Sequence, residues 1–93
     1  MQVTIKVIEG RSKKYNNKVF TFNNCKKCTI ESYNFKLKEL VEQEGFVFTF
    51  EFNNRIYKGR IENDYQFGWR CSLNGISNGG TIAFESIEII EIN

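Results

Sequence analysis

The stretch FVFTFEFNNRIYKGRIE, residues 46–62, decides the fold class. Its first half alternates phenylalanine with other residues, so the four phenylalanines share one face of a strand. Asn53 and Asn54 follow, and asparagine tolerates the positive φ that a two-residue hairpin loop requires. The second half reads as a returning strand in which Gly59 predicts a bulge or a sharp bend. The stretch therefore predicts a β-hairpin with one apolar face.

Period-two alternation continues on both sides of this hairpin. On the N-terminal side it predicts strands around 3–7 and 20–22, which we expect to pair. On the C-terminal side, Tyr65, Phe67, Trp69, Cys71 and Leu73 fall on a single face. The alternation of residues 81–92 breaks near Ser86, which predicts two strands that meet at a corner.

Residues 34–44 carry two periods at once. Tyr33, Phe35 and Leu37 alternate like a strand, whereas Leu37, Leu40 and Val41 are spaced like a helix face. We favour a short helix over 34–44 that is capped by Asn34 or Ser32 and ended by Gly45. Its lysine-early, glutamate-late order opposes the helix dipole.

Ninety-three residues suit one domain, and 41% apolar with 15% aromatic content suits a packed core. No apolar run approaches the ~18 residues that a membrane span needs. The N-terminal stretch MQVTIKVIEG reads as a strand and carries Lys6, unlike a signal peptide. We therefore expect a cytoplasmic protein that does not associate with membranes, in a compartment where structural disulfides are rare.

Residues 34–93 resemble the Sm-like barrel, which is a short helix followed by five bent strands. FEFNNRIYKGRIE (50–62), with its bend at Gly59, and Gln66-Phe67 in the next strand are similar to the bacterial RNA-chaperone (Hfq) branch of that family. WYL-type barrels match in the same loose way. Where the chaperones carry a Tyr-Lys-His RNA site, this chain has Phe84, Glu85 and Ser86, so that site is not carried over.

The resulting prediction is a mainly β (α+β) fold in a single domain, 1–93. It consists of a basic β-hairpin with a Cys-x2-Cys turn (1–30) and a helix plus a small, partly open SH3/Sm-like barrel (34–93). The resemblance also implies a possible homo-oligomer, because Sm-like barrels join edge strands into rings. The apolar stretch from Ile87 to Ile92 is the predicted edge.

Charge is distributed unevenly: residues 1–38 hold nine basic and two acidic residues, whereas 39–93 hold four and nine. Such asymmetry points to an anionic partner for the basic part or to attraction between the two parts. Cations for phosphates beside an aromatic ring for bases suit RNA or another single strand. The predicted nucleic-acid site comprises Arg11, Lys13, Lys14, Tyr15, Lys18, Lys26 and Lys27. Arg55, Lys58, Arg60 and Arg70 form a second cationic group on the polar strand faces.

The alternative function is protein binding, by an inhibitor or adaptor such as a phage or mobile-element protein that blocks a host nucleic-acid enzyme. Its acidic C-terminal half would then face a basic partner surface. The residues predicted for that surface are Glu62, Asp64, Glu85, Glu88 and Glu91.

Catalysis and cofactors find little support in the sequence. There is no histidine, so acid–base chemistry would need a strongly shifted carboxylate, lysine or cysteine. Cys25 and Cys28 have the spacing of a zinc knuckle, and Cys71 is a third candidate ligand, but a closed structural site needs four. We therefore interpret NNCKKCTI (23–30) as a polar turn and expect neither enzyme activity nor a cofactor.

Overall fold

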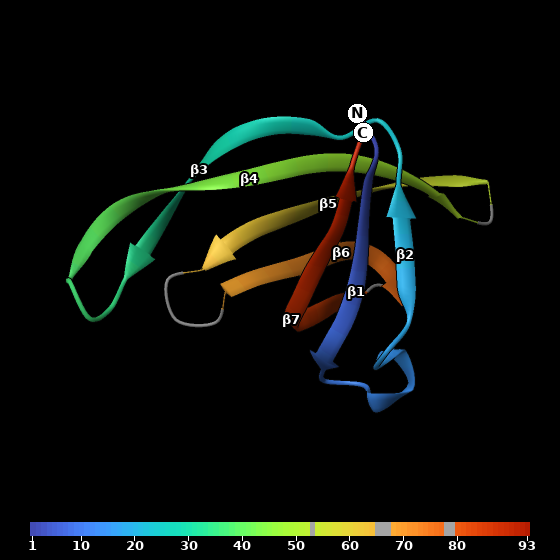
Figure 1. The fold of residues 1–93 in the computed structure, drawn as a ribbon, viewed down its shortest axis with the longest axis horizontal. Helices are drawn as coiled ribbons and strands as arrows, with labels where there is room; N and C mark the ends of the chain where they lie inside the picture. Colours follow the sequence, from blue (N-terminus) through green and yellow to red (C-terminus); the bar gives the residue numbers. More distant parts are fainter. Residues whose placement is uncertain (53, 65–67, 78–79) are drawn as a thin grey trace.

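The computed structural model describes residues 1–52, 54–64, 68–77 and 80–93. Its strands form one antiparallel sheet in the order β2-β1-β7-β6-β5-β4-β3 (Figure 1). β3 to β7 form a meander, while β1 lies beside β7 and β2 lies outside β1. The elements are β1 (Val3–Gly10), a 3-10 turn (Lys13–Tyr15), β2 (Val19–Phe22), β3 (Lys26–Asn34), β4 (Glu39–Phe52), β5 (Arg55–Asp64), β6 (Gly68–Ser77) and β7 (Gly80–Ile92).

The mainly β prediction is confirmed, but the sheet does not close into a barrel. β2 and β3 are the two edges, and the chain crosses from one edge to the other through residues 23–25. Two backbone hydrogen bonds hold this crossing: the Cys25 N–H donates to the Met1 carbonyl, and the Met1 amine to the Cys25 carbonyl. The segments 1–30 and 34–93 thus contribute to the same sheet.

The predicted helix over 34–44 is wrong. Residues 35–38 form a turn between β3 and β4, and Asn34 pairs with Glu39 across it. The buried Asn34 side chain explains the turn, because its Oδ1 accepts the backbone N–H groups of Lys36 and Leu37 at 3.0 and 3.1 Å. Lys38 completes the reversal with a φ of 52°. Asparagine thus orders a turn by bonding its own neighbours instead of capping a helix.

The predicted hairpin of residues 46–62 is present, with Phe52 paired to Arg55 across the loop. Asn54 has a φ of 58°, as the loop requires, and Asn53 lies outside the described residues. Gly59 does not form a bulge: the β4–β5 register runs unbroken through the Phe48–Gly59 pair. The Phe48 ring lies over Gly59, where a Cβ would overlap it. Close packing, and not a bend, requires this glycine.

The C-terminal segment is one strand, β7, and not two strands at a corner. Its register against β1 and β6 shifts between Phe84 and Ile87, so the break near Ser86 is a bulge. β7 lies between β1 and β6, but its pairing with β6 ends at Ile87, so in the described chain residues 88–92 pair only with β1 and leave their other side open, as the sequence predicted.

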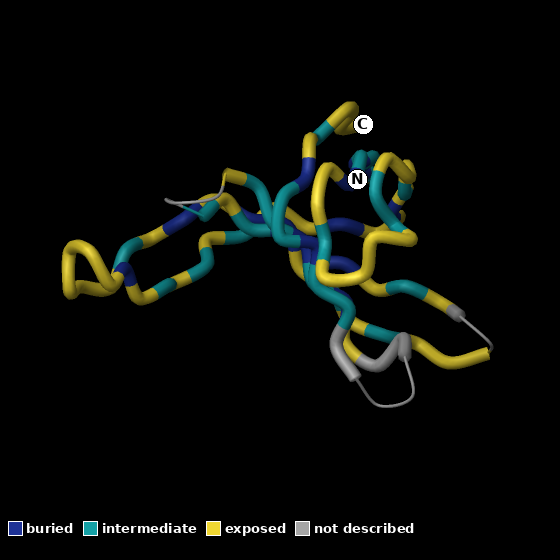
Figure 2. Tube along the Cα trace, turned by 90° about the horizontal axis from the view of Figure 1, so that it is seen from below, coloured by how far each residue is buried: buried dark blue, intermediate teal, exposed yellow. Residues whose placement is uncertain are grey.

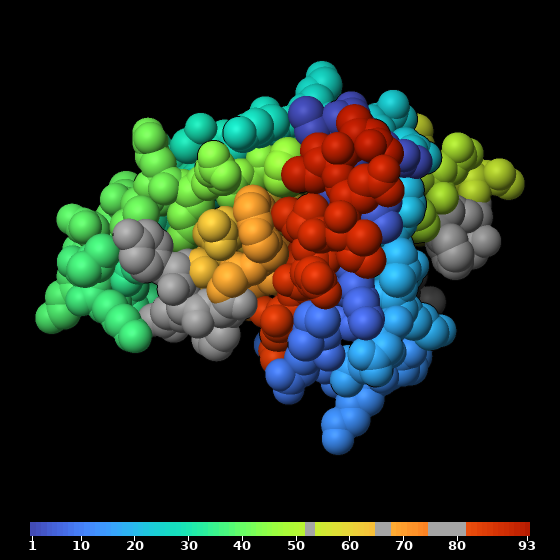
Figure 3. All heavy atoms as spheres, viewed as in Figure 1, coloured from blue at the N-terminus to red at the C-terminus, as the bar shows by residue number. Residues whose placement is uncertain are grey.

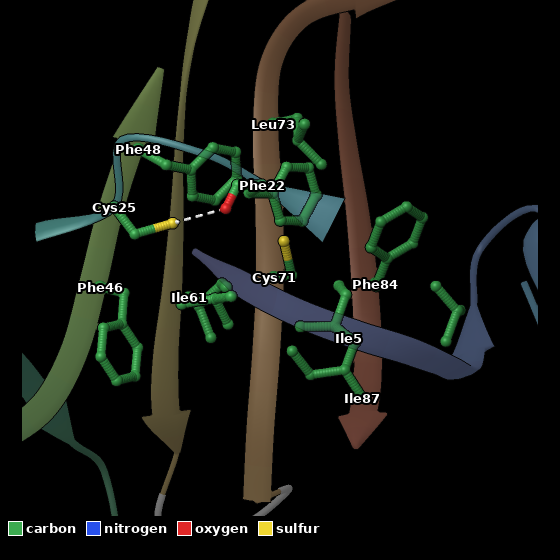
Figure 4. Close-up of a cluster of buried hydrophobic side chains, with 12 residues drawn as sticks. Ile5, Phe22, Cys25, Phe46, Phe48, Ile61, Cys71, Leu73, Phe84 and Ile87 are labelled. Atoms are coloured by element: carbon green, nitrogen blue, oxygen red, sulfur yellow. Dashed lines mark hydrogen bonds between the residues drawn. The ribbon is translucent and has the colours of Figure 1, made fainter. Parts of the chain in front are cut away.

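The core fills the inner face of the curled sheet (Figure 4). Phe22 from β2 stacks on Phe48 from β4 with ring centroids 4.0 Å apart, so the curl brings the edge strand β2 against β4, the neighbour of the opposite edge strand β3. Cys71 and Leu73 share the predicted face, whereas Tyr65, Gln66 and Phe67 lie outside the described residues. The buried apolar residues are Val3, Ile5, Val7, Phe22, Cys25, Phe46, Phe48, Ile61, Cys71, Leu73, Phe84 and Ile87.

Candidate binding surfaces

The predicted basic site divides into two groups. The β1–β2 loop holds Arg11, Lys13, Lys14, Tyr15 and Lys18 at one end of the hairpin, and β3 begins with Lys26 and Lys27 at the other end (Figure 1). β1 spans the gap, roughly 20–25 Å at ~3.3 Å per residue. The two groups therefore do not form one surface.

Backbone hydrogen bonds order the β1–β2 loop. The Asn17 N–H donates to the Val7 carbonyl at 2.8 Å, and the Val7 N–H donates to the Lys18 carbonyl at 2.9 Å. Asn17 has a φ of 66°, which asparagine tolerates. The loop is thereby fixed to β1.

Tyr15 is half-buried and packs edge-on against Phe84, with centroids 5.6 Å apart, and near Phe20 at 6.1 Å. The Lys14 ammonium lies 4.9 Å from the centroid of the Tyr15 ring. The ring therefore anchors the loop to the core and is only partly open to a base. All four cations of the loop are exposed, and Arg11 alone lies near an acid, with its Nε 3.9 Å from Glu85.

Lys26 and Lys27 point to opposite faces of β3. Lys27 pairs in register with the inward-facing Phe46, and its ammonium lies 3.6 Å from Glu44. Lys26 pairs with Val47, which in turn pairs with Arg60, so the three form a row across β3, β4 and β5 on the outer face. Thr49 and Lys58 form the next row on the same face. Lys58 and Arg60, two of the four residues of the second predicted cationic group, therefore lie side by side on this face.

A groove of about 580 Å³ follows these rows, and we call it the β4–β5 groove. Val47 and Gly59 give it an apolar floor, and Lys26, Lys58 and Arg60 are exposed cations around it. None of the described residues that line it is acidic. They are Asn24, Lys26, Val47, Phe48, Thr49, Lys58, Gly59 and Arg60.

Residues 29–44 form an arm that extends beyond the rest of the sheet. The last described β4–β5 pair is Gly45–Glu62, so within the described chain residues 39–44 of β4 pair only with β3. Figures 2 and 3 show this ribbon projecting from the body with an exposed tip. Four apolar side chains at or near the tip are open to solvent: Phe35 (78%), Leu40 (69%), Leu37 (53%) and Tyr33 (49%).

Three of the five acidic residues of the alternative lie beside an arginine. Glu62 lies 3.6 Å from Arg60, Asp64 lies 3.3 Å from Arg70, and Glu85 is the partner of Arg11. Glu88 and Glu91 remain exposed on β7. The arm carries more acidic residues than this exposed pair on β7. It has four glutamates, Glu31, Glu39, Glu42 and Glu44, and two lysines, Lys36 and Lys38.

The cysteines do not converge on a metal site. Cys25 and Cys71 are buried in the core, and the Cys25 thiol donates to the Phe22 carbonyl (Figure 4). The predicted polar turn of residues 23–30 is limited to 23–25, because β3 begins at Lys26; Cys28 lies on β3 and shares the outer face with Lys26. Burial raises the pKa of the Cys25 and Cys71 thiols, which disfavours the thiolate that binds metal. Within the described ranges, no group of three or more His, Cys, Asp or Glu side chains is placed to hold a metal ion.

The arm tip and the groove floor were not predicted as functional. Lys26, Val47 and Arg60 lie far apart in sequence, so only the register of three strands brings them together. The tip residues carried a signal, the alternation of Tyr33, Phe35 and Leu37, but it was assigned in part to a helix.

In the described parts of the chain, no helix is long and apolar enough to cross a bilayer. Comparison with protein-family models, with curated proteins and with solved structures finds no match for this chain.

Proposed function

We propose that this protein is a small non-enzymatic module that binds nucleic acid, RNA or another single strand, through its β1–β2 loop. The observation that carries the proposal is the clustering of four exposed cations on one ordered loop: Arg11, Lys13, Lys14 and Lys18. A loop held by hydrogen bonds and by the Tyr15 anchor loses little entropy when it meets a phosphate backbone. The cations supply affinity without sequence selectivity.

Lys26 and Lys27 are left out of this site because they lie at the far end of β1. The Sm-like resemblance of residues 34–93 is a separate proposal that favours the same ligand class. It adds no residue to the loop.

The test is fluorescence anisotropy with a labelled oligouridylate at several salt concentrations. Four phosphate contacts give a slope of log K against log salt of about −2.8, at ~0.7 per contact for a single strand. K13E/K14E should abolish binding, and K13A/K14A should reduce the slope by about 1.4.

The matched control is K36E/K38E on the arm tip, which changes net charge by the same amount at another surface. Its binding should stay within about twofold of the unsubstituted protein. Equal weakening by both double reversals would show that only net charge matters, and the loop assignment would then be wrong.

Protein binding is the second candidate, favoured by the exposed apolar tip of the arm. Monomeric soluble proteins rarely expose a contiguous apolar patch without a partner for it. An inhibitor or adaptor role would use this arm in preference to the five carboxylates predicted from the sequence, since three of those are paired with arginine.

A further inference from the structure

Several features of the arm lower its stability as an isolated two-stranded ribbon in water. A two-stranded ribbon without a third strand is marginally stable at best. Glu31 and Glu42 face each other directly across the two strands, and like charges in that position are destabilising. Phe35 and Leu40 are among the most exposed large apolar side chains described. The arm would therefore gain stability from contact with another surface.

The same molecule carries a surface that complements it. The arm tip carries Phe35, Leu37 and Leu40 with Lys36 and Lys38 between them, and residues 29–44 as a whole have a net charge of −2 because four glutamates outnumber these two lysines. The β4–β5 groove has an apolar floor at Val47 and three exposed cations at its rim. A volume of about 580 Å³ is large enough to receive several apolar side chains.

The arm cannot reach the groove of its own chain. It leaves the sheet at Gly45, only two residues from Val47 in the groove floor, and it continues away along the same two strands. A paired ribbon cannot reverse direction within two residues. Contact between arm and groove therefore requires a second copy.

We propose that the arm tip of one copy docks in the β4–β5 groove of a second copy. Phe35, Leu37 and Leu40 cover the groove floor, and the arm glutamates lie near Lys26, Lys58 and Arg60. The contact joins two different surfaces, so each copy offers one arm and one groove. Head-to-tail contacts of this kind produce a ring if the rotation closes and an open chain if it does not. The β1–β2 loop takes no part, so nucleic-acid binding and this assembly stand or fall separately.

The test compares two variants, alone and mixed, by sedimentation velocity on purified protein. F35S/L40S alters the arm and leaves the groove intact, and K58E/R60E alters the groove and leaves the arm intact. We expect the unsubstituted protein to assemble and each variant alone to be monomeric. An equimolar mixture should form a dimer and nothing larger, since only one competent arm and one competent groove remain.

The control V19S/I90S removes two exposed apolar side chains from other strands and should assemble like the unsubstituted protein. Three results would overturn the proposal. The first is an unsubstituted protein that stays monomeric to roughly millimolar concentration, where even the weakest specific contacts are populated. The second is assembly that survives either double substitution. The third is two monomeric variants that fail to combine although each is folded by circular dichroism.

Discussion

Replacement of Gly59 by alanine should lower the free energy of unfolding by more than a Gly→Ala substitution in a strand usually does. The added Cβ would overlap ring carbons of Phe48, and that ring is stacked on Phe22 with centroids 4.0 Å apart. Phe48 is 3% exposed and Phe22 1% exposed, so both rings are buried. The ring can yield only if the core moves.

Overpacking of a well-filled core costs about 1–3 kcal/mol, and the trapped ring places G59A near the upper end, at about 3 kcal/mol. For a chain of this length that is a fall in Tm of about 12–24 °C. Urea unfolding followed by circular dichroism measures the free energy directly.

Gly10 provides the matched control. A Cβ there would lie 3.5 Å from Phe84 Cδ1, which is an ordinary contact, so G10A should change stability by less than about 1 kcal/mol. In an F48L background the ring is gone, and the cost of G59A should fall below about 1 kcal/mol. If G59A costs no more than G10A, or if F48L does not relieve it, the packing described for β4 and β5 is wrong.

Further predictions concern the arm and the cysteines. Asn34→Ala removes the acceptor for two turn N–H groups, so amide exchange in the arm should accelerate about tenfold while Asn54→Ala leaves the arm unchanged. Cys28 should react with a thiol reagent in the folded protein, whereas Cys25 and Cys71 should react only on unfolding, because they are buried. Burial raises the pKa of the Cys71 thiol in the folded protein above its value in the unfolded chain. The neutral thiol therefore contributes fully to the free energy of unfolding below the unfolded pKa, and this contribution is lost as pH rises above about 9, where the unfolded thiol ionises. Stability should therefore fall less steeply above pH 9 in Cys71→Ala than in the unsubstituted protein; equal slopes would contradict this.

Local patterns predicted local structure well. The hairpin of residues 46–62 was predictable because strict alternation and two asparagines agree on one structure. Residues 34–44 were not, because helical and strand periods coexist there and the outcome depends on hydrogen bonds from the Asn34 side chain. The bulge near Ser86 left a signal, the break in alternation, but its form depends on pairing with two neighbouring strands.

The binding surfaces were less predictable because they depend on strand order. Four loop cations came together as expected, since they are close in sequence. Lys26 and Lys27 did not join them, because the chain crosses between sheet edges immediately after β2. A single sequence carries no signal for that crossing, nor for the register that places Lys26 beside Arg60.

The pairing of β1 with β7 has a consequence for how the chain is made. About 80 residues separate these strands, so at ~5–20 residues per second β7 leaves the ribosome roughly 4–16 s after β1. Until then β1 lacks its neighbour in the sheet, and Phe84 and Ile87 of β7 are missing from the core around its inward side chains Val3, Ile5 and Val7. The β1–β2 hairpin alone is too small to bury them. Nascent chains stalled before β7 should therefore bind a chaperone through this apolar face, and release should follow translation of the last strand.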